Sequence, residues 1–78
     1  MSDTNEKVRT AVAEIMGLAP TAIVGAHRFD EDLGADELDL VELAMELEEQ
    51  FGIEINDGEF HALKTIDDVV RFIDTEVG

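Results

Sequence analysis

The segment from Glu37 to Phe51 constrains the fold most, because its apolar side chains recur at the spacing of an α-helix. Asp36 stands before it in the position of an N-cap, and Asp39 follows three residues later in a capping-box-like position. Gly52 comes directly after the segment and is expected to end the helix. The pattern therefore predicts a helix over Glu37–Phe51.

Three other segments carry helical signals. The first covers about Asp3–Met16 and is followed by Gly17, and the last begins at Thr65 with Asp68 in a capping-box position. A short helix is predicted at about Asp57–Ala62. The apolar residues that mark one face of the first helix are Val8, Val12 and Ile15.

The connection from Leu18 to Ala35 has no regular apolar spacing and is punctuated by Pro20, Gly25 and Gly34. A loop of this length is improbable in a compact domain unless apolar side chains fix it to the core. The stretch "IEINDGEF" alternates briefly like a strand but has no matching strand, so we expect a loop there. The side chains expected to fix the long connection are Leu18, Ile23, Val24, Phe29 and Leu33.

A chain of 78 residues is too short to divide its core, so residues 1–78 are expected to form one domain. It contains no cysteine, which excludes disulfides, zinc-thiolate sites and a cysteine nucleophile. Stability must then come from apolar packing. The expected fold is an all-α four-helix bundle with three main helices, a short third helix and a long first loop.

The net charge of −15 comes from 20 acidic and five basic residues, and 13 of the acidic residues lie between Arg28 and Lys64, where no Lys or Arg occurs. Nucleic acids and anionic membranes are therefore poor partners, and a protein with a basic patch is expected instead. With no long apolar run and no basic leader, we expect a cytoplasmic monomer.

The predicted helix over Glu37–Phe51 has two apolar stripes. The wider stripe suits the bundle core, whereas Leu38, Val41 and Met45 form a narrow strip between carboxylates. This strip is either a docking face or a surface covered by another helix, and the spacing alone leaves both open. The residues of the wider stripe are Leu40, Leu43, Ala44, Leu47 and Phe51.

No residue pattern supports catalysis or a dedicated metal site. The stretch "DEDLGADELD" lacks the glycine position of an EF-hand loop. His27 and His61 stand in no ligand pair, and each is expected to be a loop or helix-surface residue. Gly25 and Gly34 are isolated, so no phosphate-binding glycine loop is present. We expect no catalytic residue, no metal and no enzyme activity.

The stretch "FDEDLGADELDLVELAMELEEQFGIEI" resembles the central signature of acyl carrier proteins, the small acidic four-helix carriers of fatty-acid and polyketide synthesis. The resemblance covers nearly the whole chain. It implies modification by 4'-phosphopantetheine on a serine between the aspartate and leucine of the motif. Here that position is Glu37, and the only serine of the chain is Ser2. A carboxylate has no hydroxyl for the phosphodiester, so we expect no cofactor on this chain.

Glu37 has two interpretations. It is a favourable helix-start residue, stabilised by the helix dipole by about 0.3–1 kcal/mol, or its carboxylate partly imitates the charge of the modified serine. The resemblance also implies that the second predicted helix docks on basic patches of partner enzymes, and that the bundle interior opens for an acyl chain. The docking residues expected besides the position of Glu37 are Asp36, Leu38, Asp39, Val41, Glu42, Met45, Glu48 and Glu49.

Two origins explain a carrier sequence without its serine: a natural paralogue that lost carriage and kept docking, or a variant of an ordinary carrier. In the second case the chain would carry acyl thioesters on phosphopantetheine if residue 37 is natively serine. The same resemblance assigns an interior position to Leu40, Leu43, Leu47, Phe51, Ile55, Ile66 and Val69.

Overall fold

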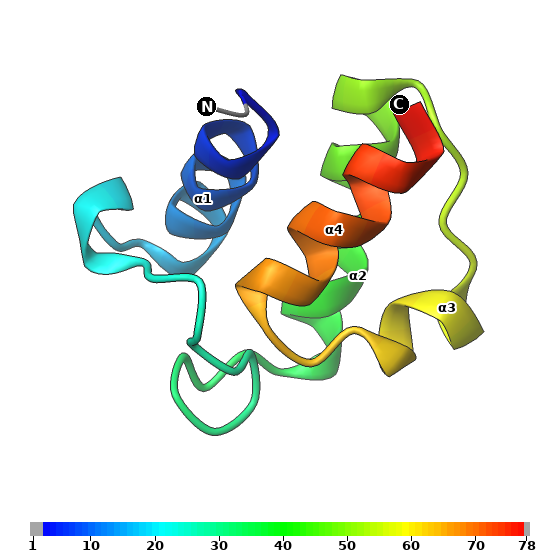
Figure 1. Ribbon diagram of the computed structural model, residues 1–78. Coiled ribbons are helices and arrows are strands. Elements are labelled where there is room, and N and C mark those ends of the chain that lie inside the picture. The colour runs from blue at the N-terminus through cyan, green and yellow to red at the C-terminus, as the bar shows by residue number, and fades with distance from the viewer. Residues whose placement is uncertain (1–2, 78) are drawn as a thin grey trace.

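The computed structural model describes residues 3–77, and this part of the chain is helical (Figure 1). It contains no strand, only an isolated bridge between Arg28 and Thr65. The all-α prediction is confirmed. The elements in chain order are α1 (Asp3–Met16), the 3₁₀ helix η1 (Pro20–Ala22), α2 (Glu37–Phe51), α3 (Asp57–Ala62) and α4 (Ile66–Val77).

The helix ends follow the capping signals of the sequence. Asp36 and Asp39 form a complete capping box at α2, and Asn56 and Glu59 form another at α3. α2 ends at Gly52, whose φ of 66° lies in the left-handed region that glycine adopts without steric cost. The predicted bounds of α1, α2 and α3 are therefore confirmed, whereas η1 was not predicted.

Asp68 holds the start of α4. Its Oδ2 accepts the backbone N–H groups of Lys64 at 3.1 Å and Thr65 at 3.2 Å, and the Thr65 hydroxyl accepts the N–H of Asp68 at 3.1 Å. The hydrogen bond from Lys64 is the main cause that lowers the pKa of Asp68 below 3.8, with Thr65 and Arg71 adding to it and burial opposing it. The predicted capping box is confirmed, although the helix itself begins one residue later, at Ile66.

α1 packs against both α2 and α4, so the core lies between these three helices. The Phe60 ring of α3 closes one end of this core, with its centroid 6.2 Å from that of Phe29 in the long loop. The helix residues that are buried most completely are Val8, Val12, Leu47, Ile66, Val69 and Ile73. Such a core is continuous rather than divided.

The long loop is fixed to the core by only part of the expected set. Ile23 and Phe29 are buried and Leu33 is half-buried, but Leu18 and Val24 are 43% and 50% exposed. The expectation for Leu18 and Val24 was wrong, because backbone hydrogen bonds do part of the fixing.

These bonds join the loop to the start of α4. The N–H of Ile66 donates to the carbonyl of His27 at 3.2 Å, and that of Asp67 donates to the carbonyl of Gly25 at 3.0 Å. A Cβ at residue 25 would overlap the Asp67 carboxylate, so a larger residue there would require the Asp67 side chain to turn away. The loop thus supplies acceptors for helix N–H groups that have no partner within α4.

Candidate functional site

The candidate site begins at the N-terminus of α2. Asp36 Oδ1 accepts the backbone N–H of Asp39 at 2.9 Å, and Asp39 Oδ2 accepts the N–H of Asp36 at 3.1 Å. Glu37 is the first residue of the helix and is exposed. Three carboxylates therefore stand at the positive end of the helix dipole, which favours negative charge there.

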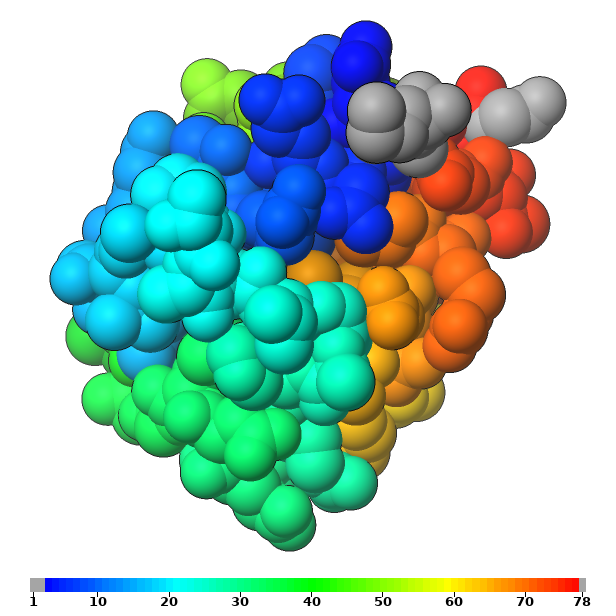
Figure 2. Space-filling model, turned by 60° about the vertical axis from the view of Figure 1, so that its left-hand side comes forward, coloured from blue at the N-terminus to red at the C-terminus, as the bar shows by residue number. Residues whose placement is uncertain are grey.

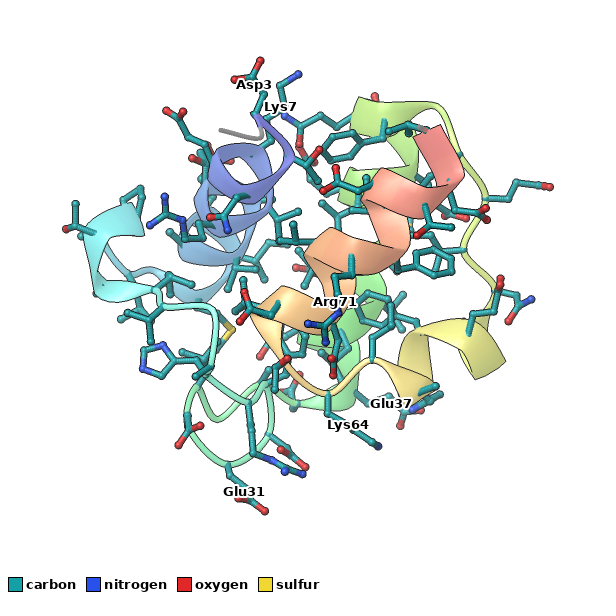
Figure 3. All side chains as sticks on the ribbon, viewed as in Figure 1. Asp3, Lys7, Glu31, Glu37, Lys64 and Arg71 are labelled. Atoms are coloured by element: carbon teal, nitrogen blue, oxygen red, sulfur yellow. The ribbon has the colours of Figure 1, made fainter. Side chains whose placement is uncertain are left out.

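Glu37 faces α3. Together with Val41 and Ala44 it lines a hollow of about 60 Å³ whose other wall is formed by Asp57 and His61. In Figure 3 the Glu37 side chain lies beside α3, at the same end of the molecule as Lys64. His61 is exposed, as expected, but its place in the same hollow as Glu37 was not predicted, because the two residues are far apart in the sequence.

The narrow apolar strip of α2 faces solvent. Leu38, Val41 and Met45 are 65%, 45% and 62% exposed, so no other helix covers them in the described structure. On the opposite side of α2, Leu43 and Leu47 are buried, while Leu40, Ala44 and Phe51 pack against the core from partly buried positions. The division of α2 into an inner and an outer apolar stripe agrees with the helical spacing.

The acidic residues of the predicted docking set fall into two groups. Asp36 and Asp39 form the capping box, and Glu48 Oε2 accepts the backbone N–H of Ile55 at 2.7 Å. Glu42 and Glu49, in contrast, are exposed. Ion pairs among the described residues involve only Arg28 and Arg71 as cations, so none joins this surface.

We use the name acidic strip for the exposed set Leu38, Val41, Glu42, Met45 and Glu49.

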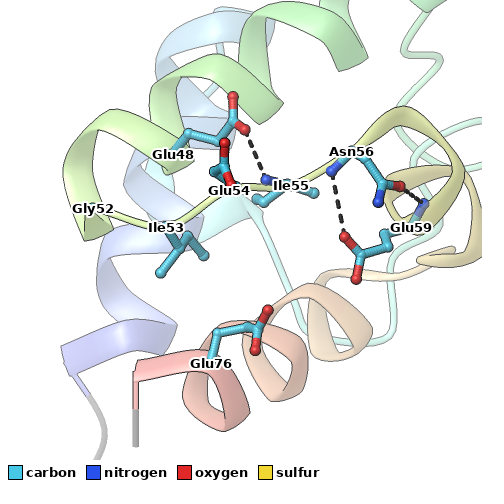
Figure 4. Close-up of a pocket in the computed structure, with 8 residues that line it drawn as sticks. All are labelled: Glu48, Gly52, Ile53, Glu54, Ile55, Asn56, Glu59 and Glu76. Atoms are coloured by element: carbon cyan, nitrogen blue, oxygen red, sulfur yellow. Dashed lines mark hydrogen bonds between the residues drawn. The ribbon is translucent and has the colours of Figure 1, made fainter.

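A large hollow lies beyond the C-terminal end of α2, between the α2–α3 connection and the end of α4 (Figure 4). Its volume is about 690 Å³, and Glu48, Glu54, Glu59 and Glu76 contribute carboxylates to its lining. Glu48 is held by Ile55, and Glu59 accepts the N–H of Asn56 at 3.4 Å. Two of these four carboxylates therefore bind backbone groups of the connection.

Two hollows reach the apolar residues of the bundle interior. The cavity lined by Val12, Phe29, Leu40 and Leu43 measures about 10 Å³, close to the least volume that a single water needs. A second hollow of about 120 Å³ opens beside Leu40 and Phe60. Of the residues assigned to the interior by resemblance, those that are buried are Leu43, Leu47, Ile55, Ile66 and Val69.

The start of α2 offers carboxylates and neither a hydroxyl nor a thiol. Within residues 3–77, no group of three or more His, Asp and Glu side chains is arranged to hold a metal ion. The same part of the chain contains no helix long and apolar enough to cross a membrane. What this surface presents is therefore negative charge around an apolar centre.

Comparison with known proteins gives a consistent family. The family model described as "Phosphopantetheine attachment site" matches residues 6–73. The chain is 45% identical over 74 residues to an acyl carrier protein of Zymomonas mobilis, and this match covers 95% of each of the two chains. It is 49% identical over 76 residues to an acyl carrier protein of Thermosynechococcus vestitus, covering 97% of this chain and 94% of the relative.

Solved structures agree with this match. The solution structure of a candidate acyl carrier protein from Anaplasma phagocytophilum has a TM-score of 0.85 at 31% identity, covering 95% of this chain and 88% of the other. A candidate acyl carrier protein from Mycobacterium tuberculosis also has a TM-score of 0.85, at 27% identity, and the match covers 94% of this chain and 97% of the other. The helical arrangement is therefore shared with these two structures.

Proposed function

Because the chain belongs to the acyl carrier protein family, we propose that it docks on enzymes of fatty-acid or polyketide-type synthesis through α2 without carrying a phosphopantetheine arm. Members of the family are carriers rather than catalysts, and they interact with synthase and transferase enzymes. The observation that carries the proposal is the combination of an exposed acidic strip with Glu37 at the position where the motif has its serine.

The loss of the arm follows from chemistry at residue 37. Attachment of 4'-phosphopantetheine requires a hydroxyl that forms a phosphodiester, and the Glu37 carboxylate has none. The flanking sequence "GAD" and "LDLVEL" keeps the rest of the motif, and Ser2 lies outside it. The chain as it stands would therefore remain without the arm when it meets a phosphopantetheinyl transferase.

The docking surface is supported by exposure and charge. Leu38, Val41 and Met45 form an apolar centre that is open to solvent, and a methionine adapts to differently shaped partner surfaces. Glu42 and Glu49 belong to the same acidic strip and have no ion-pair partner among the described residues. An apolar centre with an acidic rim complements a basic patch around an apolar pocket.

A structural role, rather than direct contact with a partner, is proposed as the main role of Asp36, Asp39 and Glu48. Each of these carboxylates accepts a backbone N–H group, so each first supports the fold of α2 or of the segment after it. They still add negative charge to the field that attracts a basic partner. The direct contacts are therefore proposed for the acidic strip.

Glu37 adds to docking through its charge. It stands exposed at the helix N-terminus, in the place where a carrier would hold a phosphodiester. Partner side chains that sense that negative charge would find a carboxylate instead. The imitation is partial, because a carboxylate has neither the tetrahedral geometry of phosphate nor the arm.

A second function is an ordinary carrier in which residue 37 is natively serine. The names of the two curated relatives and the phosphopantetheine family model favour this alternative. The gene sequence at codon 37 separates the two possibilities directly, because only a serine codon is compatible with the ordinary carrier.

Docking is tested by affinity for a ketosynthase with a basic carrier-binding patch. The double variant Glu42→Lys, Glu49→Lys should bind at least about tenfold more weakly, since a reversed rim charge repels the patch. A matched control is Glu14→Lys, Glu76→Lys, which makes the same change of net charge at exposed residues of α1 and α4. Equal weakening by both double variants would show a net-charge effect and reject the acidic strip as the docking surface.

A further inference from the structure

A tight turn of the long loop, at residues 24–27, is closed by two hydrogen bonds. The backbone N–H of His27 donates to the carbonyl of Val24 at 3.0 Å, and the N–H of Val24 donates back to the imidazole Nδ1 of His27 at 3.1 Å. Asp30 and Asp32 accept other N–H groups of the loop through carboxylates, whereas the acceptor here is a ring nitrogen. We call the bond from Val24 to the ring the histidine clasp.

The histidine clasp requires one state of the imidazole. Nδ1 accepts a hydrogen bond only through its lone pair, so it carries no proton, and the neutral ring has its proton on Nε2. Protonation of the ring makes both nitrogens donors, and the Val24 N–H would then face a second donor. Histidine is the side chain whose charge ordinarily changes between about pH 5 and 8. The clasp therefore exists only while the ring of His27 is neutral.

The turn that the clasp closes also joins the loop to α4. The carbonyl of His27 accepts the N–H of Ile66 at 3.2 Å, and the carbonyl of Gly25 accepts the N–H of Asp67 at 3.0 Å. In Figure 2 the loop, in cyan and teal, lies on the near face and borders α1 in blue and α4 in orange. Both acceptor carbonyls belong to residues 24–27, so the conformation of this turn decides whether they reach the start of α4.

Charged side chains from three elements lie beside the turn. The Asp67 carboxylate of α4 lies against Gly25, and α1 contributes charged residues to a hollow that Val24 and Gly25 also line. Arg28 is paired with carboxylates of its own loop. Protonation of His27 adds a positive charge among these groups and gives the Val24 N–H no new acceptor. The charged residues on these elements are Asp3, Glu6, Arg9, Arg28, Lys64 and Asp67.

We propose that His27 is a pH-sensitive device of the long loop. Its neutral ring fixes the turn of residues 24–27 against the start of α4, and its protonation in mild acid opens the histidine clasp and loosens the loop from Ile66 and Asp67. The change is local, because Ile23 and Phe29 on either side of the turn are buried in the core. The helices remain folded while the segment between these two anchors becomes more mobile.

The direct test is NMR spectroscopy of the full, isotopically labelled chain. At about pH 7.5, the ring of His27 should be the tautomer with its proton on Nε2, and a scalar coupling across the hydrogen bond should connect the Val24 amide nitrogen to Nδ1. The coupling should disappear as the ring becomes protonated toward about pH 5. A ring protonated on Nδ1 at the higher pH, or the absence of the coupling there, would overturn the proposal.

A substitution separates the hydrogen bond from the titration. Asparagine carries Oδ1 on the same Cγ that carries Nδ1 in histidine, so His27→Asn keeps an acceptor at every pH. Amide hydrogen exchange at Ile66 and Asp67 should be at least about threefold faster in the parent chain than in His27→Asn at about pH 5, and equal at about pH 7.5. The flanking residues of these amides are identical in both chains, so their intrinsic exchange rates cancel. The matched control His61→Asn, on α3, should leave exchange at both amides as in the parent.

Asp68 also holds the start of α4 and titrates in acid. Its pKa is lowered below 3.8, so its carboxylate stays ionised at about pH 5 and acts equally in the parent and in His27→Asn. Equal exchange in these two chains at about pH 5 would show that protonation of His27 does not reach α4, and would reject the proposal. The coupling in the parent chain decides the case even where a variant fails to fold. Docking through α2 enters neither measurement, so the two proposals fail independently.

Discussion

The Glu48 carboxylate accepts the backbone N–H of Ile55 at 2.7 Å, across seven residues and around the end of α2. Ile55 is buried, and the Glu48 carboxylate is the acceptor that the structure gives its backbone N–H. One acidic residue of the predicted docking helix therefore holds the connection to α3. This relationship separates acidic residues that build the surface from those that are free to contact a partner.

Substitution of Glu48 tests this role. Glu48→Ala leaves the Ile55 N–H without an acceptor, and the free energy of unfolding should fall by about 1–3 kcal/mol. The neighbouring exposed residue provides the control, because Glu49→Ala should change stability by no more than about 0.5 kcal/mol. Both are measured by chemical denaturation. Equal losses in the two variants would mean that the Glu48 bond contributes nothing specific.

The two apolar stripes of α2 should differ in their effect on stability. Leu47 is fully buried, so Leu47→Ala should destabilise the fold by about 2–5 kcal/mol through lost burial and a cavity. Met45 is 62% exposed, so Met45→Ala should cost no more than about 0.5 kcal/mol while weakening partner binding. Thermal melting of both variants measures the contrast. A large loss for Met45→Ala would place this residue in the core after all.

Asp68 should make stability depend on acid pH. Its pKa is lowered below 3.8 in the folded chain, chiefly by the hydrogen bond from Lys64. A lowered folded pKa adds stability that is fully present above the unfolded value and is lost as the pH falls through the folded value. The Asp68→Asn variant should therefore have a lower free energy of unfolding than the parent chain near pH 7. This difference in stability should shrink as the pH falls below 3.8. A difference that stays constant down to pH 2 would contradict the stabilised carboxylate.

Clustered negative charge should make the fold sensitive to salt. Thirteen acidic residues lie between Arg28 and Lys64 without a basic residue among them, so screening relieves repulsion within the folded state. The midpoint of thermal unfolding should rise as sodium chloride increases from low to physiological concentration. Unfolding in matched buffers measures this. A midpoint that falls with added salt would show that attractive ion pairs dominate instead.

The main helices could be predicted from the sequence because local signals mark where they begin and end. Asp36 with Asp39 and Gly52 mark both ends of α2, and its apolar spacing predicts which side is buried. Exposure of the strip centred on Val41 could not be decided from spacing, since it depends on where α3 packs. The ends of α2 and its buried side have causes that lie within the same stretch of the chain, whereas the exposure of the strip does not.

Features that depend on tertiary geometry were missed. The bond from Glu48 to Ile55 and the hollow shared by Glu37 and His61 join parts of the chain that no periodicity relates. Val24 was expected in the core because it is apolar, but the backbone bonds between the loop and α4 leave it exposed. Sequence patterns alone carry no signal for contacts of this kind.

The central claim is that a carrier surface persists here without a residue that accepts the arm. The most direct measurement is the intact mass of the chain and of Glu37→Ser after incubation with coenzyme A and a phosphopantetheinyl transferase. We predict no mass change for the chain and gain of the phosphopantetheine mass by Glu37→Ser, because only the hydroxyl is missing. A gain by the unsubstituted chain, or no gain by a folded Glu37→Ser variant, would contradict this account.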